Sequence, residues 1–429
     1  MKKMETYRYD AHCHIFTLKY LLKEVKSLLH DILDGTYHWY DLHENKMRIS
    51  SERTNELKDF LKQLHELVRA SAGSEEENLK FLQNEARKAY PSDKLRIIPL
   101  MMDILYMLAL PLDKDMDIAK SLSLKSDEVD EQTYQEKWND ILDDFVQYIK
   151  SIEPLHKNKS LTATFSLDRE VMQIIEEERS VKHLLQEKSK REMVTATKGF
   201  YRTEGFCYHM NNLMALVKSN KNELFPFIAI DPRRAGIIDE LISGRFFEGD
   251  ARFYGVKLYP RMGYHPQCKP MDAVFKYCSD NNIPITTHCG MSGFPPGENW
   301  RYAEFGNPLN FEPVIKKYPK LKIDFAHLGS SSTSLKWANT IVRLINENEN
   351  VFSDLSCYTK TETLDRILPL WNDNPKLKDR IMFGTDFDVM YFTAHITMQG
   401  YYANFKSIFS ESDLNKLMIV NPNRFLFHE

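Results

Sequence analysis

Residues Tyr7–His14 have the sequence YRYDAHCH, a short run that ends in two histidines separated by one residue. The run is of strand length and rich in aromatic side chains, which favours a β-strand. Side chains alternate between the two faces of a strand, so His12 and His14 are expected on one face and Cys13 on the other. The segment therefore predicts a strand that carries two imidazoles side by side at its C-terminal end.

Seven more apolar runs of strand length follow this first one, and most end in a polar or charged residue. They are Leu95–Asp103, Leu224–Asp231, Phe253–Tyr259, Ile283–Cys289, Leu321–His327, Val351–Cys357 and Ile381–Asp386. From the third run onward the starts lie about thirty residues apart, which suits a strand, a helix and two loops. Helical patterns fill several of these gaps, as in Met271–Asn281 and Lys336–Asn346. Eight strands alternating with helices predict an α/β fold, the (β/α)₈ TIM barrel.

The first two gaps between strands are much longer than the others. They cover about residues 17–94 and 104–223, and both are rich in charged residues with helical patterns. Gln132–Lys150 and Leu167–Lys190 are predicted to be amphipathic helices. We interpret both segments as helical insertions within a single domain that covers residues 1–429. Such loops lie at the mouth of a barrel, so the insertions are expected to form a lid, a contact in a homo-oligomer, or additional packing without a functional role.

The composition excludes several classes of protein. The chain of 429 residues has 57 Lys+Arg and 61 Asp+Glu, a formal net charge of −4, which argues against a general binder of nucleic acid or anionic membranes. Residues Met1–Asp10 lack the apolar stretch of a signal peptide, and prolines interrupt the apolar stretch Leu95–Leu112, which is too short to span a bilayer. The six cysteines show no C-x-x-C spacing. We expect a cytoplasmic protein that acts on a small molecule.

Histidines and one aspartate recur where the predicted strands end. They are His12, His14, His288, His327 and Asp386. In a barrel these ends meet at one mouth, so the five side chains are expected close together. Imidazole and carboxylate groups form a ligand set for a divalent transition metal, with zinc favoured and Mn, Fe, Co or Ni also compatible. Taken singly, the H-x-H motif is often incidental, His288 could be a hydrogen-bonded core residue, and Asp386 could cap a helix.

Several segments resemble one family, the amidohydrolase superfamily, and within it the amidohydrolase-related (amidohydrolase 2) branch. The branch includes aminocarboxymuconate-semialdehyde decarboxylase. The resemblance rests on the order of the histidines and on Asp10–Phe16 (DAHCHIF), Gly255–Pro260 (GVKLYP), Thr287–Gly290 (THCG), Ala326–Gly329 (AHLG), Gly384–Phe387 (GTDF) and Asn421–Phe425 (NPNRF). It covers the first strand and about residues 224–429, and it does not cover the insertions.

The resemblance implies four metal ligands, which are His12, His14, His288 and Asp386. It places His327 beside the metal, where this residue would polarise a bound group or transfer a proton. Asp388 is a competing carboxylate after the eighth strand, but the G-[ST]-D pattern of the family matches Asp386. His327 and Asp386 are therefore the predicted catalytic residues.

The leading hypothesis is a metal-dependent hydrolase in which activated water attacks an amide, ester or lactone carbonyl. A non-oxidative decarboxylase with the same ligands is the nearest alternative, and a barrel that binds a ligand without turnover is the second. Lys257 and Arg261, on and after the fourth strand, are the predicted substrate-binding residues. In part of the superfamily the lysine at the position of Lys257 is carboxylated and bridges two metals, which stays an alternative. Arg233 and Arg234 are further candidates to bind an acidic substrate.

Overall fold

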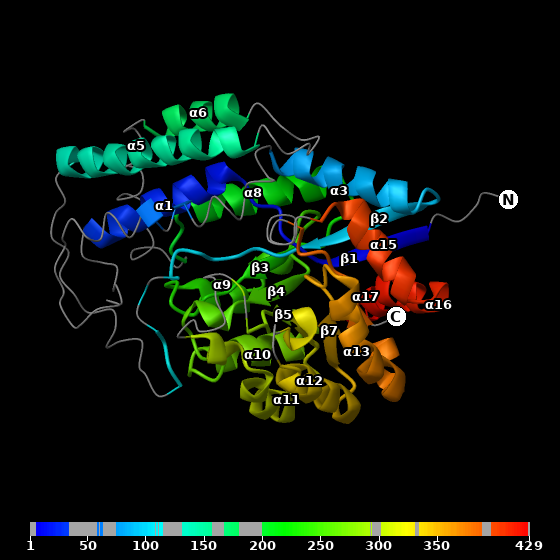
Figure 1. Cartoon of the computed structure of the whole chain (residues 1–429). Coiled ribbons are helices and arrows are strands. Elements are labelled where there is room, and N and C mark those ends of the chain that lie inside the picture. Colours follow the sequence, from blue (N-terminus) through cyan, green and yellow to red (C-terminus); the bar gives the residue numbers. More distant parts are fainter. Residues whose placement is uncertain are drawn as a thin grey trace.

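Eight parallel strands form the centre of the protein (Figure 1). The computed structural model describes residues 6–33, 58–59, 61–62, 74–107, 109, 111–114, 131–156, 167–179, 200–291, 293, 302–330, 334–387 and 396–427. The strands are β1 (Thr6–Cys13), β2 (Asp93–Pro99), β3 (Phe227–Ala229), β4 (Gly255–Leu258), β5 (Ile285–Thr287), β6 (Ile323–Phe325), β7 (Val351–Asp354) and β8 (Ile381–Met382). Each of the eight predicted runs coincides with one strand, which lies within the run or, for β1 and β2, begins one or two residues before it.

The strands pair in the order of the sequence, and every pair is parallel. β1 pairs with β2, and β3 to β8 form a six-stranded sheet. Backbone hydrogen bonds join the two sheets at both edges: Met101 N donates to Phe227 O at 3.1 Å, and Ala11 N donates to Phe383 O at 2.8 Å. The predicted (β/α)₈ barrel is confirmed, with the closure that removes exposed sheet edges.

β5, β6 and β8 are shorter than predicted, and they end before the candidate site residues that follow them. β5 ends at Thr287 and β6 at Phe325, so His288 and His327 follow their strands. β8 contains only two residues and ends four residues before Asp386. The prediction that His288, His327 and Asp386 belong to strands was wrong, and for His327 and Asp386 the backbone conformation shows why. His327 and Asp386 have φ of 61° and 53°, and a residue in the left-handed region cannot continue a strand.

Helices surround the barrel on the outside (Figure 1). In the second half of the chain they are α9 (Ile237–Ile242), α10 (Met271–Asp280), α11 (Glu312–Lys317), α12 (Lys336–Glu347), α13 (Thr361–Asp373), α15 (Met398–Ile408), α16 (Glu411–Asn415) and α17 (Asn421–Phe427). Their apolar faces pack on the outer side chains of the strands and form the main core. The two predicted helices Met271–Asn281 and Lys336–Asn346 match α10 and α12 within one residue at each end.

The two long predicted insertions contain helices as well. α1 (Leu18–Leu33) and α3 (Glu75–Ala89) lie between β1 and β2, and α5 (Glu131–His156), α6 (Leu167–Glu178) and α8 (Glu204–Ser219) lie between β2 and β3. α1 packs on α8, while α5 and α6 pack on the outer side of α1 (Figure 1). Residues 180–190 of the predicted helix Leu167–Lys190 lie outside the described residues. The division into one domain with two insertions stays a prediction.

A second apolar cluster ties α1 and α5 to the rim of the barrel. It combines Phe16 after β1, Met102 after β2 and Tyr259 after β4 with Trp138 of α5. Because these residues follow the C-terminal ends of strands, the helices between β1 and β3 pack beside the mouth of the barrel. No helix in the described part of the chain is long and apolar enough to cross a bilayer.

Candidate metal centre

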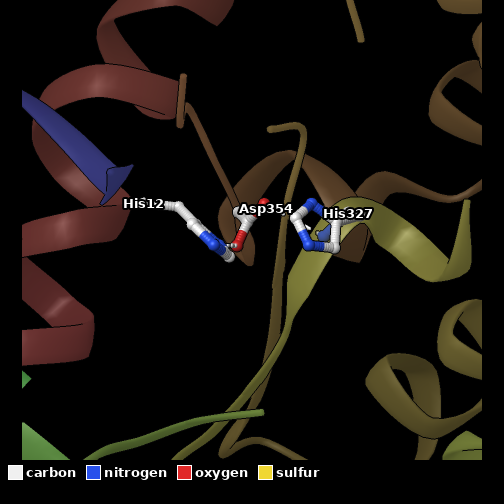
Figure 2. A group of neighbouring side chains, drawn as sticks. All are labelled: His12, His327 and Asp354. Atoms are coloured by element: carbon white, nitrogen blue, oxygen red, sulfur yellow. Dashed lines mark hydrogen bonds and ion pairs between the residues drawn. The ribbon is translucent and has the colours of Figure 1, made fainter. Parts of the chain in front are cut away.

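Strand β1 presents His12 and His14 at the mouth of the barrel, and each imidazole is oriented by a buried acceptor. His12 Nδ1 lies 2.8 Å from Asp354 Oδ2 on β7, as Figure 2 shows, and His14 Nδ1 lies 2.7 Å from the carbonyl oxygen of Leu100. Both acceptors require a hydrogen on Nδ1, which leaves a lone pair on each Nε2. Imidazoles that bind metals are commonly fixed in this way by their second nitrogen.

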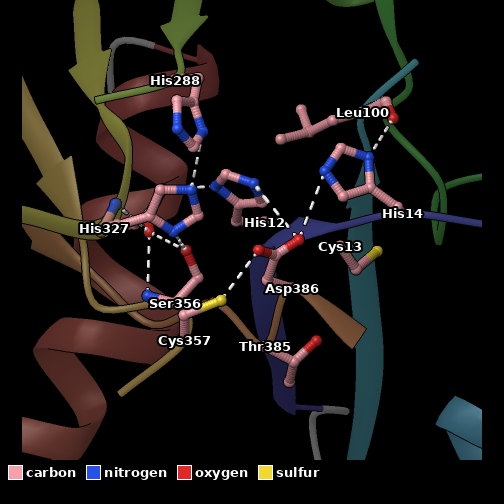
Figure 3. Close-up of polar contacts among 12 residues, drawn as sticks. His12, Cys13, His14, Leu100, His288, His327, Ser356, Cys357, Thr385 and Asp386 are labelled. Atoms are coloured by element: carbon pink, nitrogen blue, oxygen red, sulfur yellow. Dashed lines mark hydrogen bonds and ion pairs between the residues drawn. The ribbon is translucent and has the colours of Figure 1, made fainter. Parts of the chain in front are cut away.

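A carboxylate faces the two Nε2 atoms (Figure 3). Asp386 Oδ1 lies 3.3 Å from His14 Nε2 and 3.8 Å from His12 Nε2. Asp386 is only 4% exposed, and its Oδ1 has no hydrogen-bond donor among the described residues. Ligand atoms of the three side chains lie within 4.8 Å of one another. Three lone-pair atoms that converge in a buried site repel one another unless a cation lies between them. The donor set therefore fits a divalent metal ion.

The charges of the site agree with this donor set. Burial lowers the pKa of His14 to about 3 and that of His327 to about 4, so both imidazoles are neutral near pH 7. Burial alone would raise the pKa of Asp386, but the neighbouring imidazoles, His12 foremost, hold it below its ordinary value. Neutral imidazoles and an ionised carboxylate are the protonation states that bind a metal.

His288 and His327 belong to a chain of hydrogen bonds on the other side of the centre (Figure 3). The Ser356 hydroxyl donates to Asp354 Oδ1, so its oxygen accepts from His327 Nδ1 at 2.8 Å. His327 Nε2 then accepts from His288 Nδ1 at 3.2 Å, which leaves the lone pair of His288 on Nε2. His288 also stacks on Tyr259, with ring centroids 4.2 Å apart.

The structure thus brings together three of the four predicted ligands, His12, His14 and Asp386. His288 contacts His327 and is not part of that compact group. Its role as a fourth ligand stays a prediction, which the position of its lone pair permits. His327 lies beside the centre, with its ring centroid 4.7 Å from that of His12.

Lys257 places a buried positive charge at the same site. Its Nζ lies 3.5 Å from His12 Nε2, and the residue is 1% exposed. Burial lowers the pKa of Lys257 to about 8, while the carboxylates of Asp386 and Asp354 oppose that shift. Its role in substrate binding stays a prediction, which its position beside His12 permits.

The candidate arginines form ion pairs or hydrogen bonds with other groups of the protein. Arg233 pairs with Asp231 at 2.6 Å, and Arg234 forms two hydrogen bonds to Asp103 at 2.6 and 2.8 Å. The structure thus gives both guanidinium groups a carboxylate partner of their own, which argues against the expected contact with an acidic substrate. Arg261 is fully buried and donates to the carbonyl oxygen of Met291 at 2.9 Å. Its role in substrate binding stays a prediction, and Asp388 lies outside the described residues.

Sequence reasoning missed the segment that follows β7. Asp354 contacts His12 (Figure 2), Ser356 contacts His327, and Cys357 contacts Asp386 (Figure 3). The rule that singled out His288 and Asp386 selects a polar residue at the end of a predicted strand, and it does not find Asp354, which lies in the middle of the predicted run Val351–Cys357. The structure ends β7 at Asp354, and no sequence pattern indicates which imidazole this carboxylate contacts.

The backbone is strained at the same positions. Six non-glycine residues among those described have positive φ, a conformation that asparagine, aspartate and histidine adopt more readily than leucine and cysteine, and two of the six are asparagines away from the centre. The other four are His327 (61°), Leu328 (45°), Cys357 (63°) and Asp386 (53°), all at or beside the centre. Strained backbone of this kind costs about 1–3 kcal/mol per residue and concentrates at functional sites.

Comparison with known proteins gives one family match. A family model described as amidohydrolase matches residues 178–427. Among solved structures, the chain is similar to 2,6-dihydroxybenzoate decarboxylase from Rhizobium, at 18% identity and a TM-score of 0.39 over 52% of this chain and 77% of that one. It is also similar to a probable 2-pyrone-4,6-dicarboxylic acid hydrolase from Acinetobacter baumannii, at 12% identity and a TM-score of 0.40 over 51% and 78%. None of the curated proteins matches the chain.

Proposed function

Since this chain belongs to the amidohydrolase family, we propose that it is a metal-dependent hydrolase of an amide, ester or lactone in a small molecule. The observation that carries the proposal is the convergence of His12 Nε2, His14 Nε2 and Asp386 Oδ1 on one point. We propose these three side chains, with His288, as the ligands of one divalent ion, and zinc as that ion. When bound there, such an ion would lower the pKa of a coordinated water molecule and polarise a carbonyl oxygen.

The side chains around this point have distinct proposed tasks. Asp386 accepts a proton from the attacking water and passes it to the leaving group, as an ionised carboxylate beside the reacting atoms can do. His327 is neutral, because burial lowers its pKa to about 4, so it can take up a proton at Nε2 during the reaction and return it to a bound group. Asp354 and Leu100 hold the imidazoles of His12 and His14 in the tautomer that leaves Nε2 available.

Decarboxylation is the second candidate, and the buried Lys257 is compatible with it. An ammonium group 3.5 Å from His12 Nε2 would hold a substrate carboxylate beside the centre. An acidic hydrolase substrate would be bound in the same way, so Lys257 supports a carboxylated small molecule in either case.

We also propose a cytoplasmic location, which the six free cysteines support, since disulfides are rare in reducing compartments.

A paired assay separates these reactions. Purified protein supplied with Zn²⁺ is incubated with p-nitrophenyl esters and lactones, and in parallel with hydroxybenzoates while CO₂ release is followed. We expect ester or lactone hydrolysis that is lost in Asp386→Asn and kept in His265→Ala, which removes an imidazole that the proposal does not use. CO₂ release without hydrolysis would replace the hydrolase by the decarboxylase. Zn²⁺ binding without either reaction would favour a barrel that binds a ligand without turnover.

A further inference from the structure

One short segment after β7 contacts three residues of the proposed centre. Asp354 accepts from His12, Ser356 accepts from His327, and Cys357 contacts Asp386. In Figure 3 the side chains of Ser356 and Cys357 point toward the imidazole of His327 and the carboxylate of Asp386. The first two contacts involve common partners of imidazoles, whereas the third uses a thiol.

The thiol of Cys357 donates a hydrogen bond to one oxygen of the Asp386 carboxylate, and the other oxygen faces the proposed metal centre. Cys357 Sγ donates to Asp386 Oδ2 at 2.9 Å, while Oδ1 lies 3.3 Å from His14 Nε2. Rotation about the last torsion of an aspartate is only weakly restricted, so a carboxylate needs a partner to hold it in one orientation. No donor to Oδ1 exists among the described residues, and the thiol is the hydrogen-bond donor on Oδ2.

The backbone at Cys357 is an independent observation. Its φ of 63° lies in the left-handed region, which glycine adopts without strain and which other residues rarely occupy. A glycine at this position would relieve the strain, but it would lack the thiol. The strained cysteine therefore points to a requirement for its side chain rather than for the turn.

We infer that Cys357 is a positioning residue that holds the carboxylate of Asp386 in the orientation needed to bind the metal. The inference rests on the proposed function, since it assumes a metal bound by His12, His14 and Asp386. The thiol acts as a neutral hydrogen-bond donor and not as a ligand. Partners of this kind orient the groups that contact the metal, and their loss typically weakens metal binding by about 10- to 100-fold.

The test compares Zn²⁺ affinity among variants of the full chain, measured by competition with a chromophoric chelator. Cys357→Ala removes the donor, Cys357→Ser keeps a shorter donor, and Cys357→Gly removes the donor while relieving the backbone strain. Cys207→Ala is the matched control, because Cys207 is another partly exposed free cysteine, on α8. Thermal unfolding of the metal-free variants shows whether they fold. Absorption of the Co²⁺-loaded wild type reports on sulfur ligation, since a coordinated thiolate gives an intense charge-transfer band.

We expect Cys357→Ala and Cys357→Gly to bind Zn²⁺ about tenfold or more weakly, with Cys357→Ser closer to the wild type and Cys207→Ala unchanged. Cys357→Gly should unfold at a temperature no lower than Cys357→Ala, so that weak binding cannot be ascribed to misfolding. Unchanged affinity in both donor-free variants would overturn the inference and leave the proposed function standing. A thiolate-to-cobalt band in the wild type would overturn it in favour of direct ligation. A wild-type chain that binds no Zn²⁺ would overturn the proposed function and this inference together.

Discussion

Replacing Asp354 by asparagine tests how the protein fixes the imidazoles of the proposed centre. The carboxylate is fully buried, and its Oδ2 accepts from His12 Nδ1 at 2.8 Å. Its Oδ1 accepts from the backbone N–H groups of His327 at 3.0 Å and Ser356 at 2.9 Å. An amide of the same shape has only one acceptor oxygen, so its NH₂ group must face donors on one of the two sides.

Either orientation of the amide has a measurable cost. If the NH₂ group faces the backbone, buried N–H groups lose their acceptor, which costs about 1–3 kcal/mol of the free energy of unfolding. If it faces His12, the imidazole must accept at Nδ1 and carry its hydrogen on Nε2, which removes the lone pair from the centre. We therefore expect Asp354→Asn to weaken Zn²⁺ binding by about 10- to 100-fold, or about 1.4–2.7 kcal/mol, as for other groups that orient ligands.

The assay combines urea unfolding of the metal-free protein with Zn²⁺ titration by chelator competition. Asp280→Asn is the matched control, because this aspartate of α10 is solvent-exposed and pairs only with a surface lysine. The control should change the free energy of unfolding by less than about 0.5 kcal/mol. An Asp354→Asn protein that matches the wild type in both stability and Zn²⁺ affinity would refute the orientation argument.

Three further perturbations test other parts of the structure. Burial lowers the pKa of His209 to about 3, below its unfolded value, so the folded state binds fewer protons and stability falls as pH drops below about 6.5. Lowering the pH from 7 to 5 should therefore reduce the free energy of unfolding of the wild type by about 2 kcal/mol more than that of His209→Phe. Urea unfolding at both pH values measures this difference. Arg234→Met should leave the buried carboxylate of Asp103 unpaired and cost about 3–5 kcal/mol in the same assay. Gly384→Ala would place a Cβ 2.7 Å from that of His12. This overpacking should lower the free energy of unfolding by about 1–3 kcal/mol and displace the His12 imidazole. Zn²⁺ titration would detect the displacement as weaker binding.

Each of these expectations has an outcome that contradicts it. Equal pH dependence of His209→Phe and the wild type would show that the imidazole does not titrate as its burial requires. For the buried ion pair, the double variant Arg234→Met with Asp103→Leu should recover much of the lost stability, and failure to recover any would mean that the unpaired charge is not the cause. Wild-type Zn²⁺ affinity in Gly384→Ala would show that His12 can move without harm to the centre.

The fold was predictable because the spacing of apolar runs and the parity of side chains are local properties of the sequence. Eight runs and their helical gaps were sufficient for the barrel, and the i, i+2 spacing of His12 and His14 placed both imidazoles on one face. The convergence of these residues with Asp386 followed from the barrel, since the C-terminal ends of its strands meet at one mouth. Their role as ligands stays a prediction of the sequence that the geometry permits.

Long-range pairing and backbone strain were not predictable. Arg234 and Asp103 are separated by 131 residues, and nothing in either segment indicates that they form a buried pair. His327 and Asp386 adopt the left-handed conformation, which histidine and aspartate occupy more often than most residues but which nothing in the sequence assigns to these two positions. The role of Cys357 depends on which carboxylate oxygen its thiol meets, a detail that only the folded chain defines.

His12, His14 and Asp386 are proposed to form a site for one divalent metal ion. The most direct test strips the wild type and His14→Ala with a chelator and then titrates both with Zn²⁺ by calorimetry. We expect about one tight equivalent for the wild type, since His12, His14 and Asp386 form one proposed site, and loss of this binding in His14→Ala. No tight binding to the wild type, or equal binding by His14→Ala, would contradict it.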